Sequence, residues 1–82
     1  MELKRGTVAR SIAGHDKGRF MAVLSEMEGY VLVADGNTRT ICSPKRKNRI
    51  HLRGTGTVLS EQELQSDETL RCALARFAQP TV

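Results

Sequence analysis

The sequence has few of the residues on which enzymes, metalloproteins and many single-strand nucleic-acid binders depend. Its 82 residues include two cysteines, two histidines, one tyrosine and two phenylalanines, and no tryptophan. The cysteines and histidines lack the CxxC and HxxxH spacings that place ligands around zinc. No nucleophile and base stand in a recognisable catalytic motif. We therefore expect no metal site, no cofactor and no enzymatic activity.

Long apolar runs are also missing. No run approaches the roughly 18 residues that a membrane-spanning helix needs, and the N-terminal segment Met-Glu-Leu-Lys-Arg lacks the apolar core of a secretory signal. We expect one small domain, cytoplasmic, with no membrane partner. A solvent-exposed thiol at Cys72 would suit a reducing compartment, although the sequence alone also permits a Cys42–Cys72 disulfide.

Positive charge is concentrated in one part of the chain. Residues 1–53 carry eleven Lys and Arg against five Asp and Glu, whereas residues 54–82 carry two against four. The stretch from Arg39 to Arg53 contains six basic residues and no acidic one. Such asymmetry is the electrostatic pattern of a nucleic-acid-binding protein, and the alternative is a solvated basic loop.

Alternating apolar residues predict five short strands, at residues 6–13, 19–26, 29–34, 38–42 and 48–53. Five strands at this spacing predict a mainly β fold, a small barrel. Asp35-Gly36 is the strongest hairpin signal, because glycine supplies the positive φ of a tight turn. The basic run after Pro44 is expected to be a loop entering the last strand. There, alternation would point Ile50 and Leu52 inward and Arg49, His51 and Arg53 outward.

The sequence pattern changes from strand-like to helix-like after residue 56. We place there the boundary between a barrel (1–56) and a C-terminal helical extension (57–82). Ser60 to Glu63 has the spacing of a capping box, and Ser66-Asp67-Glu68 is a second helix start. Leu70, Ala73, Leu74 and Phe77 form one apolar stripe at helical spacing. The pattern predicts a helix over 67–78 that packs on the barrel and ends at Pro80.

The stretch from Val8 to Arg19 resembles the KOW motif, a strand-loop-strand pattern in which Gly18 occupies the position of the motif's key glycine. The resemblance continues through residues 29–36 and 44–52, where the sequence is similar to bacterial relatives of the large-subunit ribosomal protein L-fourteen-e. The resemblance implies an SH3-like five-stranded barrel that binds RNA. Ribosomal RNA or the ribosome is the partner it implies.

Motif position implies that Lys17 and Arg19 meet phosphates and that Gly18 lets the backbone approach RNA. Asp16 is expected to brace its own loop through hydrogen bonds to backbone. The basic run is expected to supply most of the attraction, with Asn48 as a donor and with Arg10, Arg39 and His51 as further contacts on strands. The predicted RNA-binding residues are Arg10, Lys17, Gly18, Arg19, Arg39, Lys45, Arg46, Lys47, Asn48, Arg49 and His51.

The three aromatic residues all lie in apolar patterns, so the sequence favours recognition of the shape and phosphates of structured RNA over base stacking. A second hypothesis stays open. KOW domains also occur in transcription elongation factors, where the partner can be a protein. The barrel or the C-terminal helix would then dock on a translation or transcription assembly.

Overall fold

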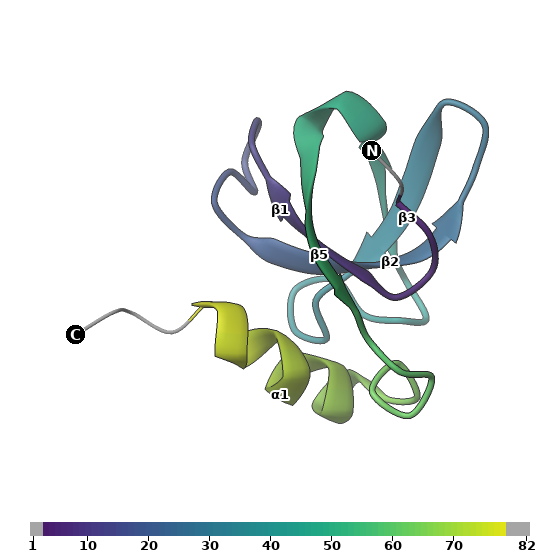
Figure 1. Ribbon diagram of the computed structural model, residues 1–82, viewed down its shortest axis with the longest axis vertical. Coiled ribbons are helices and arrows are strands. Elements are labelled where there is room, and N and C mark those ends of the chain that lie inside the picture. Colours follow the sequence, from purple (N-terminus) through teal and green to yellow (C-terminus); the bar gives the residue numbers. More distant parts are fainter. Residues whose placement is uncertain (1–2, 79–82) are drawn as a thin grey trace.

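The computed structural model describes residues 3–78 of the chain, which form five strands, one 3-10 turn and one α-helix. The strands pair in a single antiparallel sheet of order β4-β3-β2-β1-β5 (Figure 1). The elements are β1 (Thr7–Ser11), β2 (Phe20–Glu26), β3 (Tyr30–Ala34), β4 (Lys45–Asn48), η1 (Arg49–His51), β5 (Leu52–Val58) and α1 (Asp67–Ala78). The predicted mainly β fold with a C-terminal helix is confirmed.

The sheet curls strongly, because its two edge strands are consecutive in the chain. In a flat five-stranded sheet β4 and β5 would lie about 19 Å apart. The chain from Asn48 to Leu52 spans four Cα steps, which reach about 14 Å at most. Register shifts in the β1–β5 and β2–β3 ladders supply the extra bend and twist. The curled sheet stays open, since β4 and β5 remain at opposite ends of the strand order.

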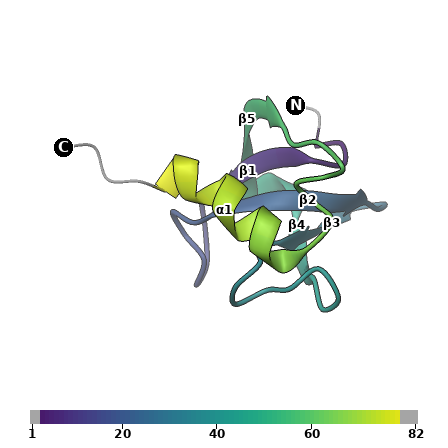
Figure 2. The same ribbon diagram turned by 90° about the horizontal axis from the view of Figure 1, so that it is seen from below.

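Each face of the sheet carries its own buried cluster. One cluster contains Ala9, Met21, Val23, Val31, Val33, Leu52 and Leu3. The other joins Val8, Ala22, Leu24 and Ala34 to Leu59, Leu64, Leu70, Ala73 and Leu74. Alternation along the strands produces this division, because successive side chains point to opposite faces. Figure 2 shows α1 lying across the second face, so the predicted packing of the helix stripe on the sheet is confirmed.

Both predicted helix-start signals form as hydrogen-bonded caps. The Ser60 amide donates to Glu63 Oε1 at 3.0 Å, and the Glu63 amide donates to Ser60 Oγ at 3.3 Å. Ser66 immediately precedes α1, and its Oγ accepts a hydrogen bond from the Thr69 amide at 3.2 Å. These bonds satisfy amides that a helix terminus leaves without partners. Pro80, the predicted end of the helix, lies outside the described residues.

The predicted strand at 38–42 is wrong, and so is the tight hairpin at Asp35-Gly36. Gly36 does adopt a positive φ of 78°. However, Asp35 Oδ1 accepts hydrogen bonds from the amides of Asn37 and Arg39, both at 2.9 Å. The side chain thereby folds the backbone into a local turn. Residues 35–44 form one long connection between β3 and β4.

This connection is fastened to the start of α1. The Ile41 amide donates to Asp67 Oδ1 at 2.8 Å, and Arg71 Nη1 donates to the Gly36 carbonyl at 3.1 Å. Gly36 is buried, and a Cβ added there would meet the Asp67 carbonyl and stand 2.9 Å from the Arg71 amide. The turn therefore needs glycine for close packing as well as for φ.

The predicted strand at 48–53 is also displaced. Residues Lys45–Asn48 form β4 instead of a loop, and β5 begins at Leu52 and runs through the boundary expected at residue 56. The 3-10 turn between them breaks the alternation of side chains. As a result Ile50 is 74% exposed rather than inward, whereas Leu52 is buried as predicted.

Replacing Gly36 tests the docking of the connection on α1. We expect Gly36→Ala to lower the free energy of unfolding by about 3 kcal/mol, because positive φ costs a residue with Cβ about 1 kcal/mol and the clash with α1 adds the rest. Gly29→Ala is the control, since Gly29 has φ of 84° and open space around its Cβ position. It should lose only about 1 kcal/mol. Urea unfolding measures both, and equal losses would contradict the docking.

Candidate nucleic-acid interface

The basic run divides between the two faces of β4. Lys45 pairs with Val33 and Lys47 pairs with Val31 in the β3–β4 ladder. Directly opposite residues share a face of the sheet, and both valines belong to a buried cluster. The side chains of Lys45 and Lys47 therefore point to the face of the sheet that carries the Met21 cluster. Arg46 and Asn48 point to the opposite, outer face and are exposed.

Asp16, in the connection between β1 and β2, forms ion pairs with both lysines. Its side chain is only 9% exposed. Asp16 Oδ2 accepts a hydrogen bond from Lys45 Nζ and lies 3.8 Å from Lys47 Nζ. Lys47 Nζ also donates to the Ala13 carbonyl at 3.2 Å. The β1–β2 connection is thus tied to β4, and the expectation that Asp16 braces its own loop through backbone hydrogen bonds is corrected.

The pKa of Asp16 is lowered from its usual 3.8. The hydrogen bond from Lys45 is the largest cause, and it prevails over burial, which acts in the opposite direction. The positive charges of Lys45, Lys47 and Arg39 lower the pKa further. The carboxylate is consequently ionised at neutral pH.

Most cations of the basic run therefore have partners inside the protein. Lys47 is 7% exposed, so it does not present the free ammonium that the sequence led us to expect. Lys45 shares Asp16, and Arg49 pairs with Glu26. Arg46 is different, because its exposed guanidinium lies over the Tyr30 ring, 4.2 Å from the centroid. Of this run, Arg46 is the cation best placed to meet a phosphate.

Two further predicted contacts, Arg39 and His51, lie in turns, and a third, Asn48, ends β4 just before one. Arg39 belongs to the β3–β4 connection and not to a strand, and its Nε is buried without a hydrogen-bond partner. His51 belongs to η1, is half-buried, and its carbonyl accepts from the Ile12 amide at 2.9 Å. Asn48 caps this turn through Oδ1, which accepts from the Ile50 amide at 3.1 Å.

The loop predicted from the KOW resemblance is exposed at its tip. Gly18 has a φ of 90°, with open space where a side chain would stand. Lys17 is exposed beside it. Arg19 donates from Nη1 to Thr38 Oγ1 at 3.3 Å and lies 3.9 Å from Asp35 Oδ2, with 53% of its side chain exposed. Gly18 thus serves the turn and leaves room for close approach.

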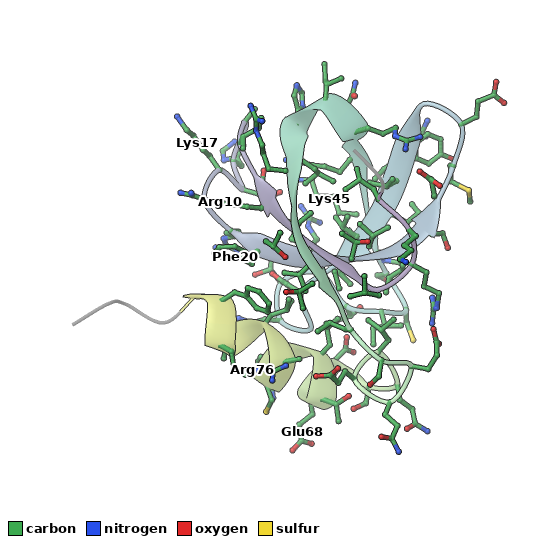
Figure 3. The ribbon with its side chains drawn as sticks, in the orientation of Figure 1. Arg10, Lys17, Phe20, Lys45, Glu68 and Arg76 are labelled. Atoms are coloured by element: carbon green, nitrogen blue, oxygen red, sulfur yellow. The ribbon has the colours of Figure 1, made fainter. Side chains whose placement is uncertain are left out.

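Arg10 and Arg53 stand directly opposite each other on β1 and β5. Both side chains are exposed, and no carboxylate among residues 3–78 lies within ion-pair distance of Arg10, Arg53 or Lys17. Figure 3 shows Arg10 and Lys17 extending from the same side of the molecule. We call Arg10, Lys17 and Arg53 the β1–β5 basic face.

Arg53 is the residue that sequence reasoning missed as a contact. It was expected to point outward, but its position beside Arg10 depends on the pairing of the first strand with the last. No local pattern signals that pairing, since the two residues are 43 positions apart in the sequence. The like-charged pair becomes visible only in the folded sheet.

The cysteines are exposed and free of disulfides. No helix within the described range is long and apolar enough to cross a membrane.

Comparison of the sequence with protein-family models and with curated proteins gives no match.

The Asp16 cluster predicts a dependence of stability on pH. Asp16→Asn would leave two lysines, one of them buried, without their carboxylate, and we expect a loss of about 3 kcal/mol in the free energy of unfolding at pH 7. Because the folded pKa of Asp16 lies below 3.8, the stabilisation is complete above that pH and disappears as the pH falls through the folded pKa.

Urea unfolding of both proteins between pH 7 and pH 2 measures this effect. The difference between wild type and Asp16→Asn should stay constant above about pH 5 and shrink below pH 3.8. Glu28→Gln removes the same charge from an exposed position in the β2–β3 turn and should leave stability unchanged. A difference that does not vary with pH would contradict the ion-pair cluster.

Proposed function

We propose that this chain is a non-catalytic, cytoplasmic RNA-binding protein with an SH3-like barrel of the KOW type, and that it binds structured RNA of the ribosome. The main contact is the β1–β5 basic face, assisted by Arg46. The resemblance of residues 8–19 to the KOW motif and the positive charge of residues 1–53 support the class of ligand. The strong curl of the five-stranded sheet supports the barrel.

The opposed pair Arg10 and Arg53 carries the proposal. Like charges directly opposite on neighbouring strands destabilise a sheet, and the part of the chain that the structure describes offers these two no neutralising acid. Packing does not account for them either, since both are exposed. A row of phosphates would relieve the repulsion and gain the charge-assisted hydrogen bonds that guanidinium groups make with phosphate.

The small number of available cations sets the expected salt dependence. Arg10, Lys17, Arg46 and Arg53 could each neutralise one phosphate. Four such contacts predict that log K falls with log salt concentration at a slope of about −3 to −4. Contacts of this kind position a protein on RNA without reading its bases.

A protein-docking module is the second candidate. The apolar stripe of α1 is packed on the sheet, so it is not free for a partner. The observation that favours docking is instead an exposed apolar tip formed by Ile50 on η1 and Ile12, which are 74% and 38% exposed. The Ile12 amide bonds to the carbonyl of His51, so these isoleucines lie on adjoining segments.

Removing the arginine pair separates RNA binding from stability. We expect Arg10→Gln/Arg53→Gln to weaken binding to a structured ribosomal RNA fragment and to make the salt slope shallower by about 1.5 to 2. Its free energy of unfolding should not fall, and relief of the repulsion should raise it by up to about 1 kcal/mol. Fluorescence anisotropy across a salt series and urea unfolding measure these effects.

The matched control is Arg5→Gln/Arg76→Gln. It removes the same two charges, but from arginines that pair with Glu61 and Glu63. Its salt slope should match that of the wild type. Equal slopes for all three proteins would exclude the β1–β5 basic face as the contact, and feeble binding with no salt dependence in the wild type would exclude RNA as the ligand.

A further inference from the structure

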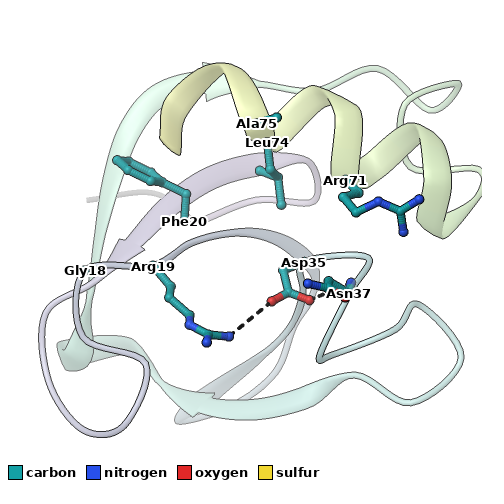
Figure 4. A pocket seen from close by; sticks show the side chains of 8 residues that line it. All are labelled: Gly18, Arg19, Phe20, Asp35, Asn37, Arg71, Leu74 and Ala75. Atoms are coloured by element: carbon teal, nitrogen blue, oxygen red, sulfur yellow. Dashed lines mark hydrogen bonds and ion pairs between the residues drawn. The ribbon is translucent and has the colours of Figure 1, made fainter. Parts of the chain in front are cut away.

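A groove opens between α1, the start of β2 and the β3–β4 connection (Figure 4). It has a volume of about 320 Å³, which lies within the range of small-ligand sites. Phe20 from β2 and Leu74 and Ala75 from α1 form its apolar walls. Arg19, Asp35 and Arg71 line its polar side.

The apolar wall is held in place by the core. The Phe20 ring is half-buried and packs against Phe77, with 5.7 Å between ring centroids and 38° between ring planes. Leu74 belongs to the same buried cluster. A planar apolar group entering the groove would therefore meet side chains whose positions are already fixed.

The polar side of the groove has hydrogen-bonding capacity to spare. Arg71 uses Nη1 for the Gly36 carbonyl, and Arg19 uses Nη1 for Thr38 Oγ1. A guanidinium has five N–H donors, so both arginines keep donors for a ligand. Asp35 Oδ1 is occupied by two backbone amides, whereas Oδ2 faces Arg19 at 3.9 Å. Guanidinium donors and a carboxylate acceptor thus lie beside the apolar wall.

The groove continues directly from the basic face. Arg10 pairs with Arg53 on one side and with Phe20 on the other. Arg53, Arg10 and Phe20 therefore form one row across β5, β1 and β2, with neighbouring strands about 4.8 Å apart. An RNA strand whose phosphates lie on the two arginines would have its adjacent nucleotide at Phe20.

We propose that this groove binds one unstacked nucleobase of the RNA that the basic face holds. The inference rests on the proposed RNA binding and adds a specificity to it. The ring of Phe20 and the apolar residues of α1 contact the faces of the base. Arg19, Arg71 and Asp35 form hydrogen bonds with its edges. Unpaired bases are commonly held in this way, by stacking on aromatic or guanidinium planes with hydrogen bonds to their edges.

The consequence is a preference for RNA that contains an unpaired nucleotide. Phosphate contacts alone would bind a paired stem and a bulged stem equally. Stacking of one base on an aromatic side chain should make the protein bind the bulged stem about fivefold or more tightly. An acidic peptide would also suit the two arginines, but it would not use the row that leads to Arg10 and Arg53.

The test compares two hairpin RNAs with the same stem and loop. One is fully paired, and the other carries one additional, bulged 2-aminopurine nucleotide in its stem. We expect the wild type to bind the bulged hairpin about fivefold or more tightly and to change the fluorescence of its 2-aminopurine. Ala75→Leu should remove both effects while leaving the affinity for the paired hairpin unchanged. Ala75 is exposed on α1, so a larger side chain fills the groove without entering the core.

Two further variants complete the test. Ala75→Ser keeps the groove open and should behave as the wild type. Phe20→Leu keeps the wall apolar but removes the ring, and it should lose the preference for the bulge. Equal affinity of the wild type for both hairpins, or an unchanged preference in Ala75→Leu, overturns the groove proposal alone. Failure of the wild type to bind either hairpin overturns this proposal together with RNA binding.

Discussion

The buried carboxylate of Asp16 is the constraint on which the rest of the structure depends. It lies in the connection between β1 and β2, yet its partners Lys45 and Lys47 stand on β4, at the far edge of the sheet. An ionised group shielded from water must be paired, so the sheet has to curl far enough to bring β4 to this loop. The requirement also fixes the register of β4. A slip by one residue would turn both lysines to the outer face and leave Asp16 without a cation.

This constraint determines which cations can face a ligand. Two of the four cations in the basic run neutralise Asp16, and Arg49 pairs with Glu26. Much of the run's charge is thus engaged within the protein, although its density along the sequence resembles that of a binding site. The opposite holds for Arg10 and Arg53, which look unremarkable in the sequence but face each other in the sheet. No carboxylate within residues 3–78 lies within ion-pair distance of either arginine, which is why we propose them as the interface.

The accuracy of the sequence-based predictions follows the range of the interactions involved. The first three strands and the helix depend on local alternation, helical spacing and caps such as Ser60 with Glu63, and these were predictable. Asp35 shapes the start of residues 38–42 through a local turn. The contacts of Ile41 and Gly36 with α1, in contrast, are encoded by no local pattern. In the candidate interface, composition revealed an excess of positive charge. It could not reveal that Lys45 meets Asp16, which is 29 residues away, or that Arg53 adjoins Arg10.

The C-terminal helix is part of the same folding unit as the sheet. Leu70 and Leu74 share one buried cluster with Val8 and Ala22, so removing α1 would expose the outer face of the sheet to water. The helix also supplies one wall of the groove, while β2 supplies the other. Without α1 the row from Arg53 through Arg10 to Phe20 would end on an open apolar surface. The basic face and the helix therefore cannot be assigned separate functions by truncation, and point substitutions on exposed positions of α1 are the appropriate means of separating them.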